Sequence, residues 1–248
     1  MTRRRPCACA CLVWRSFAML GVPALLAGVL SAQDPFEIHV LEYEELHAGE
    51  FMFEDHANYG PLHNTYELTA GISDHFSFGV MQLSAGGPGA PLESAGWRLV
   101  PHVYVPRSWR WPVDVGFVAE FSFNKAASTP DSRSVELLTI LEKHFGRIQI
   151  DLNPEFSRPL NGPNKTRGWD FGLAARLGFE ASRRFTPSLE YYSEWGPLST
   201  HQIFPGGDLR LTKNILWNVG IGAGVTSSTD RLVYKSRLEI SFGGRRKH

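Results

Sequence analysis

The chain has 248 residues, with 25 basic and 25 acidic side chains and a mean hydropathy of −0.18. A balanced charge excludes a nucleic-acid-binding protein on electrostatic grounds. Apart from an apolar run near the N-terminus, no stretch has the length of a membrane-spanning helix.

Residues 1–32 have the pattern of a secretory signal peptide. Arginines 3, 4, 5 and 15 accompany an apolar run over residues 17–30, and Ser31 and Ala32 supply small residues for cleavage after Ala32. An uncleaved anchor is the alternative, but the run is short for a spanning helix, which needs about 20 residues, and Pro23 interrupts it.

Cleavage there removes all three cysteines and four arginines, which leaves 21 basic and 25 acidic residues. We therefore expect a mature chain with no disulfide and no thiolate for catalysis or metal binding. The segment that follows, residues 33–49, is acidic and only partly alternating. We interpret it as a periplasmic lead-in or a plug within a lumen.

From residue 50 onward the chain alternates apolar and polar or small residues with a period of two, most clearly over residues 215–225. This period predicts β-strands with two different faces. The pattern predicts twelve strands, an even number as single-chain bacterial barrels have. They cover residues 50–59, 65–73, 76–83, 96–105, 113–124, 134–143, 147–157, 169–181, 185–194, 202–211, 215–226 and 231–242.

The connections alternate in length along the chain. Residues 74–75, 144–146, 182–184 and 212–214 form tight turns, whereas residues 84–95, 125–133 and 158–168 form long loops rich in Gly, Pro, Ser and Asn. Only the connection at 106–112 is longer than the other connections predicted for the end with short turns. Short turns on one side and long loops on the other are typical of outer-membrane barrels.

The sequence therefore predicts an all-β fold, a closed antiparallel up-and-down transmembrane β-barrel of about twelve strands over residues 50–242, with a C-terminal tail at 243–248. A soluble β-sandwich is the alternative, because alternation alone also describes one. Scarce branched apolar residues on the second face of most strands favour the barrel, as do aromatic residues near strand ends, where girdles form.

Strand alternation also assigns the faces. In residues 147–157 the apolar side chains Ile148, Ile150, Leu152 and Phe156 face lipid. The charged ones face the lumen, because an arginine near the bilayer midplane costs about 2–4 kcal/mol. The predicted pore-lining residues are Arg147, Gln149, Asp151, Asn153, Glu155, Asp170, Arg176, Glu180, Lys235, Arg237 and Glu239.

The signal peptide, alternating strands, Gly/Pro-rich loops and last strand ending at Phe242 resemble the bacterial outer-membrane β-barrel class, of porin or transporter kind. The segments at 34–38 and 189–198 are similar to outer-membrane proteins of this class. The resemblance implies export through the secretory pathway, contact with outer-membrane lipid and insertion by the barrel-insertion machinery. The tail at 243–248 departs from the class, whose members usually stop at the terminal aromatic residue.

The expected function is a narrow passive channel or transporter for small hydrophilic solutes, since charges of both signs project inward. One alternative is that these charges pair and close the lumen of a structural or surface-interaction barrel. The sequence indicates neither the solute nor the oligomeric state.

An outer-membrane enzyme is less favoured. His75, Phe76 and Ser77 lack the Asn that follows in barrel lipid hydrolases, and Glu54, Asp55, His56 and His63 match no known metal-ligand spacing. We predict no catalytic residue, no metal site and no cofactor. No glycine-rich phosphate loop is present in the sequence.

Overall fold

The computed structural model describes residues 36–60, 62–87, 90–195 and 199–244. The predicted signal peptide and residues 245–248 of the predicted tail lie outside this range. In the described residues no helix is long and apolar enough to cross a membrane. The regular elements are twelve strands and one 3-10 helix: β1(Glu50–Tyr59), β2(Leu62–Ser73), β3(Phe76–Gly86), β4(Glu93–Tyr104), η1(Arg107–Trp109), β5(Asp114–Asn124), β6(Arg133–Phe145), β7(Ile148–Pro159), β8(Asp170–Phe179), β9(Phe185–Trp195), β10(Thr200–Thr212), β11(Ile215–Gly224) and β12(Val233–Gly243).

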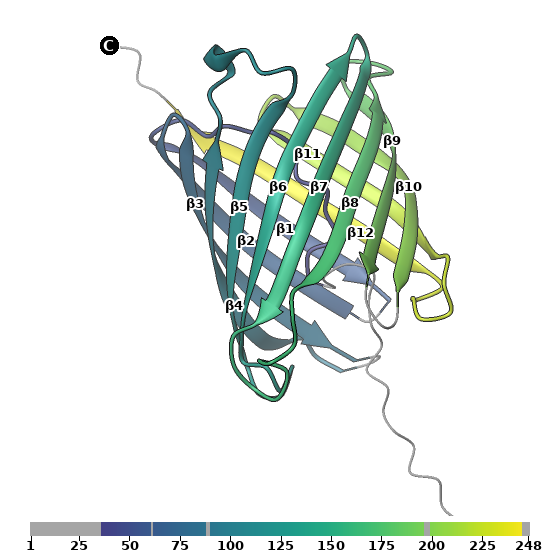
Figure 1. Cartoon of the computed structure of the whole chain (residues 1–248). Helices are drawn as coiled ribbons and strands as arrows, with labels where there is room; N and C mark the ends of the chain where they lie inside the picture. Colours follow the sequence, from purple (N-terminus) through teal and green to yellow (C-terminus); the bar gives the residue numbers. More distant parts are fainter. Residues whose placement is uncertain (1–35, 61, 88–89, 196–198, 245–248) are drawn as a thin grey trace, which may run out of the picture.

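The strands form one closed sheet in which each strand pairs antiparallel with its neighbours in sequence (Figure 1). Pairing of β1 with β12 closes the ring, with Glu50 opposite Gly243 and Tyr59 opposite Tyr234. Closure leaves no unpaired strand edge. The predicted twelve-stranded up-and-down barrel is confirmed, and the β-sandwich alternative is wrong because there are no two stacked sheets.

The two ends of the barrel differ, as the loop lengths predict. One end, here called the short-turn end, contains the start of β1 and the end of β12. It also contains the connections between β2 and β3, β6 and β7, and β10 and β11. The opposite end is the long-loop end. The connection between β4 and β5 also lies at the short-turn end, where η1 projects at the top of Figure 1. Its two tryptophans, Trp109 and Trp111, are exposed.

Burial follows the predicted alternation. On β7 the side chains of Gln149, Asp151 and Asn153 are buried inside the barrel, whereas Ile148 and Leu152 are exposed on the outside. Apolar and aromatic side chains on the outer surface also contact one another across strands. Phe171 lies 5.1 Å, between ring centroids, from both Phe156 and Trp195. An apolar outer band and a buried polar inner face are what a bilayer requires of a β-barrel.

Inward glycines make room for large side chains in the lumen. A Cβ at Gly222 on β11 would overlap the ring of Phe204, which projects from β10 and is fully buried. Gly220 leaves similar space for the stem of Lys235. The glycines of β11 therefore allow Phe204 and Lys235 to cross the interior.

We predict that Gly222→Ala lowers the free energy of unfolding by about 1–3 kcal/mol, because the Phe204 ring must leave its preferred position. Urea titration of the barrel in lipid vesicles measures this change. Gly168→Ala is the control, since nothing lies within 4 Å of a Cβ at this loop position. Equal stability of the two variants would contradict the close approach at Gly222.

Candidate functional site

The lumen is the candidate site, and a segment of the chain itself runs through it. Residues 36–48, here called the inner segment, precede β1 and lie inside the barrel. In the half nearer the long loops, the Thr65 hydroxyl donates a hydrogen bond to the Phe36 carbonyl (2.8 Å). At the short-turn end, the His47 ring lies 3.3 Å from Asp74 and the His75 ring 2.7 Å from Glu45.

Polar side chains of the wall hold the middle of the inner segment. The Asn153 side chain accepts a hydrogen bond from the Leu41 amide (2.7 Å) and donates one to the Leu41 carbonyl (3.0 Å). The Tyr43 amide donates to Glu142 (2.8 Å), and Gln149 donates to Glu42 (3.0 Å). These side chains replace the backbone partners that the inner segment would otherwise have in a sheet.

Part of the interior is apolar where the inner segment packs. Tyr43 packs into a buried cluster with Met81, Val100, Tyr104 and Ile140 from β3, β4 and β6. Further along, a second cluster contains Ile38, Val40, Ala174, Tyr192, Phe204 and Val233. The inner face is therefore polar only in part. The reason is that wall side chains covered by the inner segment have no contact with water.

The charged side chains of the middle of the lumen form a connected network. Arg176 on β8 contacts Asp151 on β7 (3.0 Å), Asp208 on β10 and Glu42 of the inner segment (3.4 Å). The Asn218 amide donates to the other oxygen of Asp208 (2.6 Å). One arginine thus links three strands to the segment that fills the lumen, because its planar guanidinium offers several donors at once.

Two other basic residues repeat this arrangement on β12. Arg237 donates to Glu54 on β1 (2.7 Å) and lies 3.5 Å from Glu239. Lys235 pairs with Glu190 on β9 and lies 3.4 Å from the Ile38 carbonyl. Because these charges are buried, each needs a partner to offset its loss of hydration.

The structure places most of the predicted pore-lining residues inside the barrel. Glu155 and Asp170 are half-buried, and Glu180 is exposed at the short-turn end, where it lines a cavity. Arg147 differs, because it lies in the turn before β7 and its guanidinium sits 5.9 Å from the ring centroid of the exposed Phe179. It is a rim residue and does not line the pore. The buried inward members are Gln149, Asp151, Asn153, Arg176, Lys235, Arg237 and Glu239.

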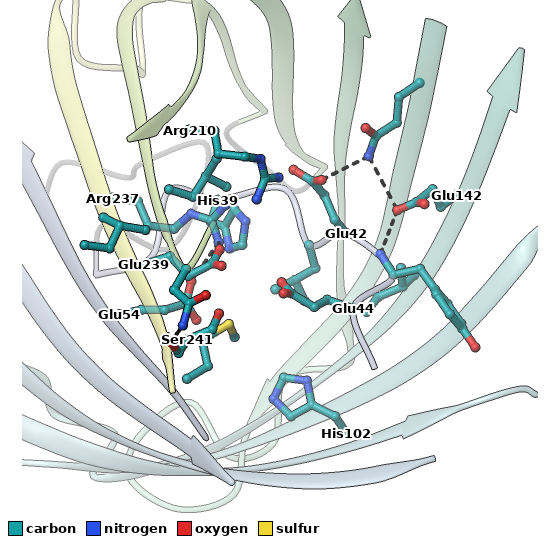
Figure 2. A pocket seen from close by; sticks show the side chains of 18 of the residues that line it. His39, Glu42, Glu44, Glu54, His102, Glu142, Arg210, Arg237, Glu239 and Ser241 are labelled. Atoms are coloured by element: carbon teal, nitrogen blue, oxygen red, sulfur yellow. Dashed lines mark hydrogen bonds and ion pairs between the residues drawn. The ribbon is translucent and has the colours of Figure 1, made fainter. Parts of the chain in front are cut away.

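A cavity of about 420 Å³ lies between the inner segment and the wall (Figure 2). Glu42 and Glu44 of the inner segment border it, and Glu54, Arg237 and Glu239 lie across from them. Seven glutamates line the cavity, against three basic side chains, Arg210, Lys213 and Arg237. The cavity is therefore acidic and suits water, cations and polar solutes.

Sequence reasoning missed several inward charges because it assigned faces on only three strands. The same period of two would have found Glu54, Glu67 and Arg98, which are all buried in the lumen. It also grouped Glu54, Asp55, His56 and His63. In the structure, however, neighbouring residues of β1 point to opposite faces of the sheet. Glu54 and His56 are buried in the lumen, whereas Asp55 accepts a hydrogen bond from Asn64.

Comparisons with known proteins agree with this architecture. No family model and no curated protein matches the sequence. Solved structures do match. The outer-membrane channel from Pseudomonas putida F1 superposes with a TM-score of 0.59 at 12% identity, over 83% of this chain and 100% of that one. The KdgM porin in complex with disordered oligogalacturonate gives 0.56 at 9% identity, over 78% and 99%. The NanC porin gives 0.52 at 9% identity, over 77% and 98%.

The chain has the fold of an outer-membrane β-barrel. At such low identity the likeness concerns the fold and carries no residue of those porins onto this chain. The side chains in the lumen of this barrel therefore have to be interpreted from their own contacts.

We predict that Arg176→Met destabilises the barrel by about 3–5 kcal/mol, because Asp151 and Asp208 then remain buried without their cation. The measurement is urea unfolding in lipid vesicles. As a matched control, Arg167→Met removes an exposed ion pair with Asp170 (3.6 Å) and should cost less than about 1 kcal/mol. A loss of the same size in both variants would refute the structural role of the Arg176 network.

Proposed function

We propose that the protein is an outer-membrane channel for small hydrophilic solutes and that the inner segment closes it. The observation that carries this proposal is that the lumen is filled by a segment that is not part of the sheet. A barrel of about twelve strands is wide enough to leave an interior beyond its own side chains. In the described residues a single strand-free segment occupies much of that interior. Displacing it would leave a water-accessible lumen with charged walls.

The contacts of the inner segment support a removable closure. It has no strand pairing, and its backbone is held by hydrogen bonds with the side chains of Asn153, Glu142 and Thr65. Each such bond contributes only about 0.5–1.5 kcal/mol net. Its side chains Ile38, Val40 and Tyr43 also pack in the two apolar clusters, but none of these contacts belongs to the sheet. The segment can therefore leave while the β1 to β12 ladder stays intact.

The lining of the cavity supports a preference for cations. Charged rings in a narrow pore with low-dielectric walls concentrate ions of the opposite sign. The solved KdgM porin is a complex with oligogalacturonate, a chain of carboxylates. The excess of glutamates here would repel such a ligand, so we propose neutral or cationic solutes.

A structural barrel with a permanently closed lumen is the second candidate. The ion pairs of Arg176, Lys235 and Arg237, together with the two apolar clusters, favour it. The two functions differ in conductance, because a permanently closed barrel passes no ions even when the inner segment is loosened.

Deleting residues 36–47 should give stable single-channel conductance in planar bilayers, where the full mature chain is closed or opens briefly. Asn153→Leu tests the same closure within the intact chain, since it removes both hydrogen bonds to Leu41, and should raise the open probability. The control is Asn161→Leu in the loop between β7 and β8. A folded deletion variant with no conductance would contradict the channel and favour the structural barrel.

Cation selectivity should also depend on the cavity glutamates. In the deletion background we expect Glu180→Gln to lower the cation-to-anion permeability ratio, because it removes one negative charge from the short-turn mouth. Reversal potentials in a salt gradient measure the ratio. Glu93→Gln, at the exposed start of β4, serves as the control. An unchanged reversal potential in Glu180→Gln would show that this mouth does not set selectivity.

A further inference from the structure

A cluster of possible metal ligands lies where the inner segment meets β1 and β2. Glu37 of the inner segment, His56 on β1 and Glu67 on β2 are all buried, and one ligand atom from each lies within 4.8 Å of the others. These residues come from three separate parts of the fold. Pairing of β1 with β2 places His56 and Glu67 near each other, and the inner segment adds Glu37 because it lies in the lumen.

The imidazole of His56 points to a ligand in this cluster. It is 2% exposed, and neither ring nitrogen has a hydrogen-bond partner among the described residues. A carboxylate oxygen of Glu54 lies 3.7 Å from its Nε2. A buried polar group without a hydrogen bond is unfavourable, so an atom that binds an imidazole nitrogen would offset the cost of burial.

The local charges also favour a cation. Four buried carboxylates lie in the cluster or next to it: Glu37 and Glu67 belong to it, and Glu54 and Glu120 are neighbours. Two guanidinium groups lie beside these carboxylates. Arg98 lies 2.7 Å from Glu120 and 3.7 Å from Glu37, and Arg237 lies 2.7 Å from Glu54. With all four carboxylates ionised, a charge of −2 remains, which a divalent cation would neutralise.

We propose that Glu37, His56 and Glu67 bind a divalent transition-metal ion of the Zn²⁺ class. An imidazole ligand favours such ions over Ca²⁺ and Mg²⁺, which take oxygen ligands. His102 on β4 lies beside this group, with its Nε2 3.9 Å from Glu67, but it is not one of the three ligands. Tetrahedral Zn²⁺ ligands lie about 3.3 Å apart, so rotation of the side chains must bring the three atoms closer by at most about 1.5 Å.

Neighbouring residues orient the Glu67 carboxylate. The Thr69 hydroxyl donates to its Oε1 (2.7 Å), as outer-shell donors do for metal-binding carboxylates. Gly79 on β3 leaves the space that Glu67 occupies, since a Cβ there would lie 2.5 Å from Oε1. The bound ion would join the inner segment to β1 and β2. The proposal of a metal site rests on these contacts and is independent of whether the barrel conducts ions.

Calorimetric titration of the EDTA-treated, folded full chain with Zn²⁺ tests the site. We expect one ion per chain, and an affinity about 100-fold weaker in His56→Gln and in Glu67→Gln, since each loses a ligand. His144→Gln is the matched control, because His144 also lies beside a glutamate, Glu142 at 2.9 Å, but outside the cluster, and it should bind Zn²⁺ as the parent chain does.

Glu37→Gln provides the variant that keeps the sheet intact, because Glu37 lies outside every strand. Zn²⁺ should raise the melting temperature of the parent chain and not that of Glu37→Gln. The proposal is overturned if the parent chain binds no Zn²⁺, in which case protons neutralise the cluster. It is equally overturned if Glu37→Gln binds and melts like the parent, or if His144→Gln loses as much affinity as His56→Gln.

Discussion

Pairing of β1 with β12 is the constraint on which the rest of the structure depends. In hydrocarbon no water can satisfy an exposed backbone amide or carbonyl, so a sheet in a bilayer must close on itself. Closure in turn fixes which face of every strand meets lipid. The apolar face of β7, with Ile148 and Leu152, then covers the outside, and Asp151 and Asn153 are confined to the interior.

The charged side chains confined to the lumen must pair with one another, and this pairing organises the interior. Asp151 and Asp208 on the wall share Arg176, and this arginine also reaches Glu42. The inner segment is therefore a partner of the wall charges as well as an obstruction. This dual role links closure to the electrostatics of the lumen, because moving the segment removes Glu42 from the network and admits water to the remaining charges. In the proposed open state, water would hydrate the remaining charges and offset part of the lost interactions.

Much of the barrel was predictable from local pattern. All twelve predicted strand starts lie within three residues of the structure, and the first strand has identical bounds, Glu50–Tyr59. Arg147 shows the limit of the pattern. It has the inward parity of Gln149, yet β7 begins one residue later and its side chain reaches Phe179 at the rim. Parity alone does not define where a strand ends, because turn geometry overrides it.

By itself the sequence determined the strands, their two faces and the even strand number, because a period of two in side-chain polarity is a local property of the chain. Only the tertiary structure decided what fills the lumen. The inner segment has no clear period, and its partners Asn153, Glu142 and Thr65 lie far from it in sequence. Glu37 likewise joins His56 and Glu67 only because that segment lies in the lumen.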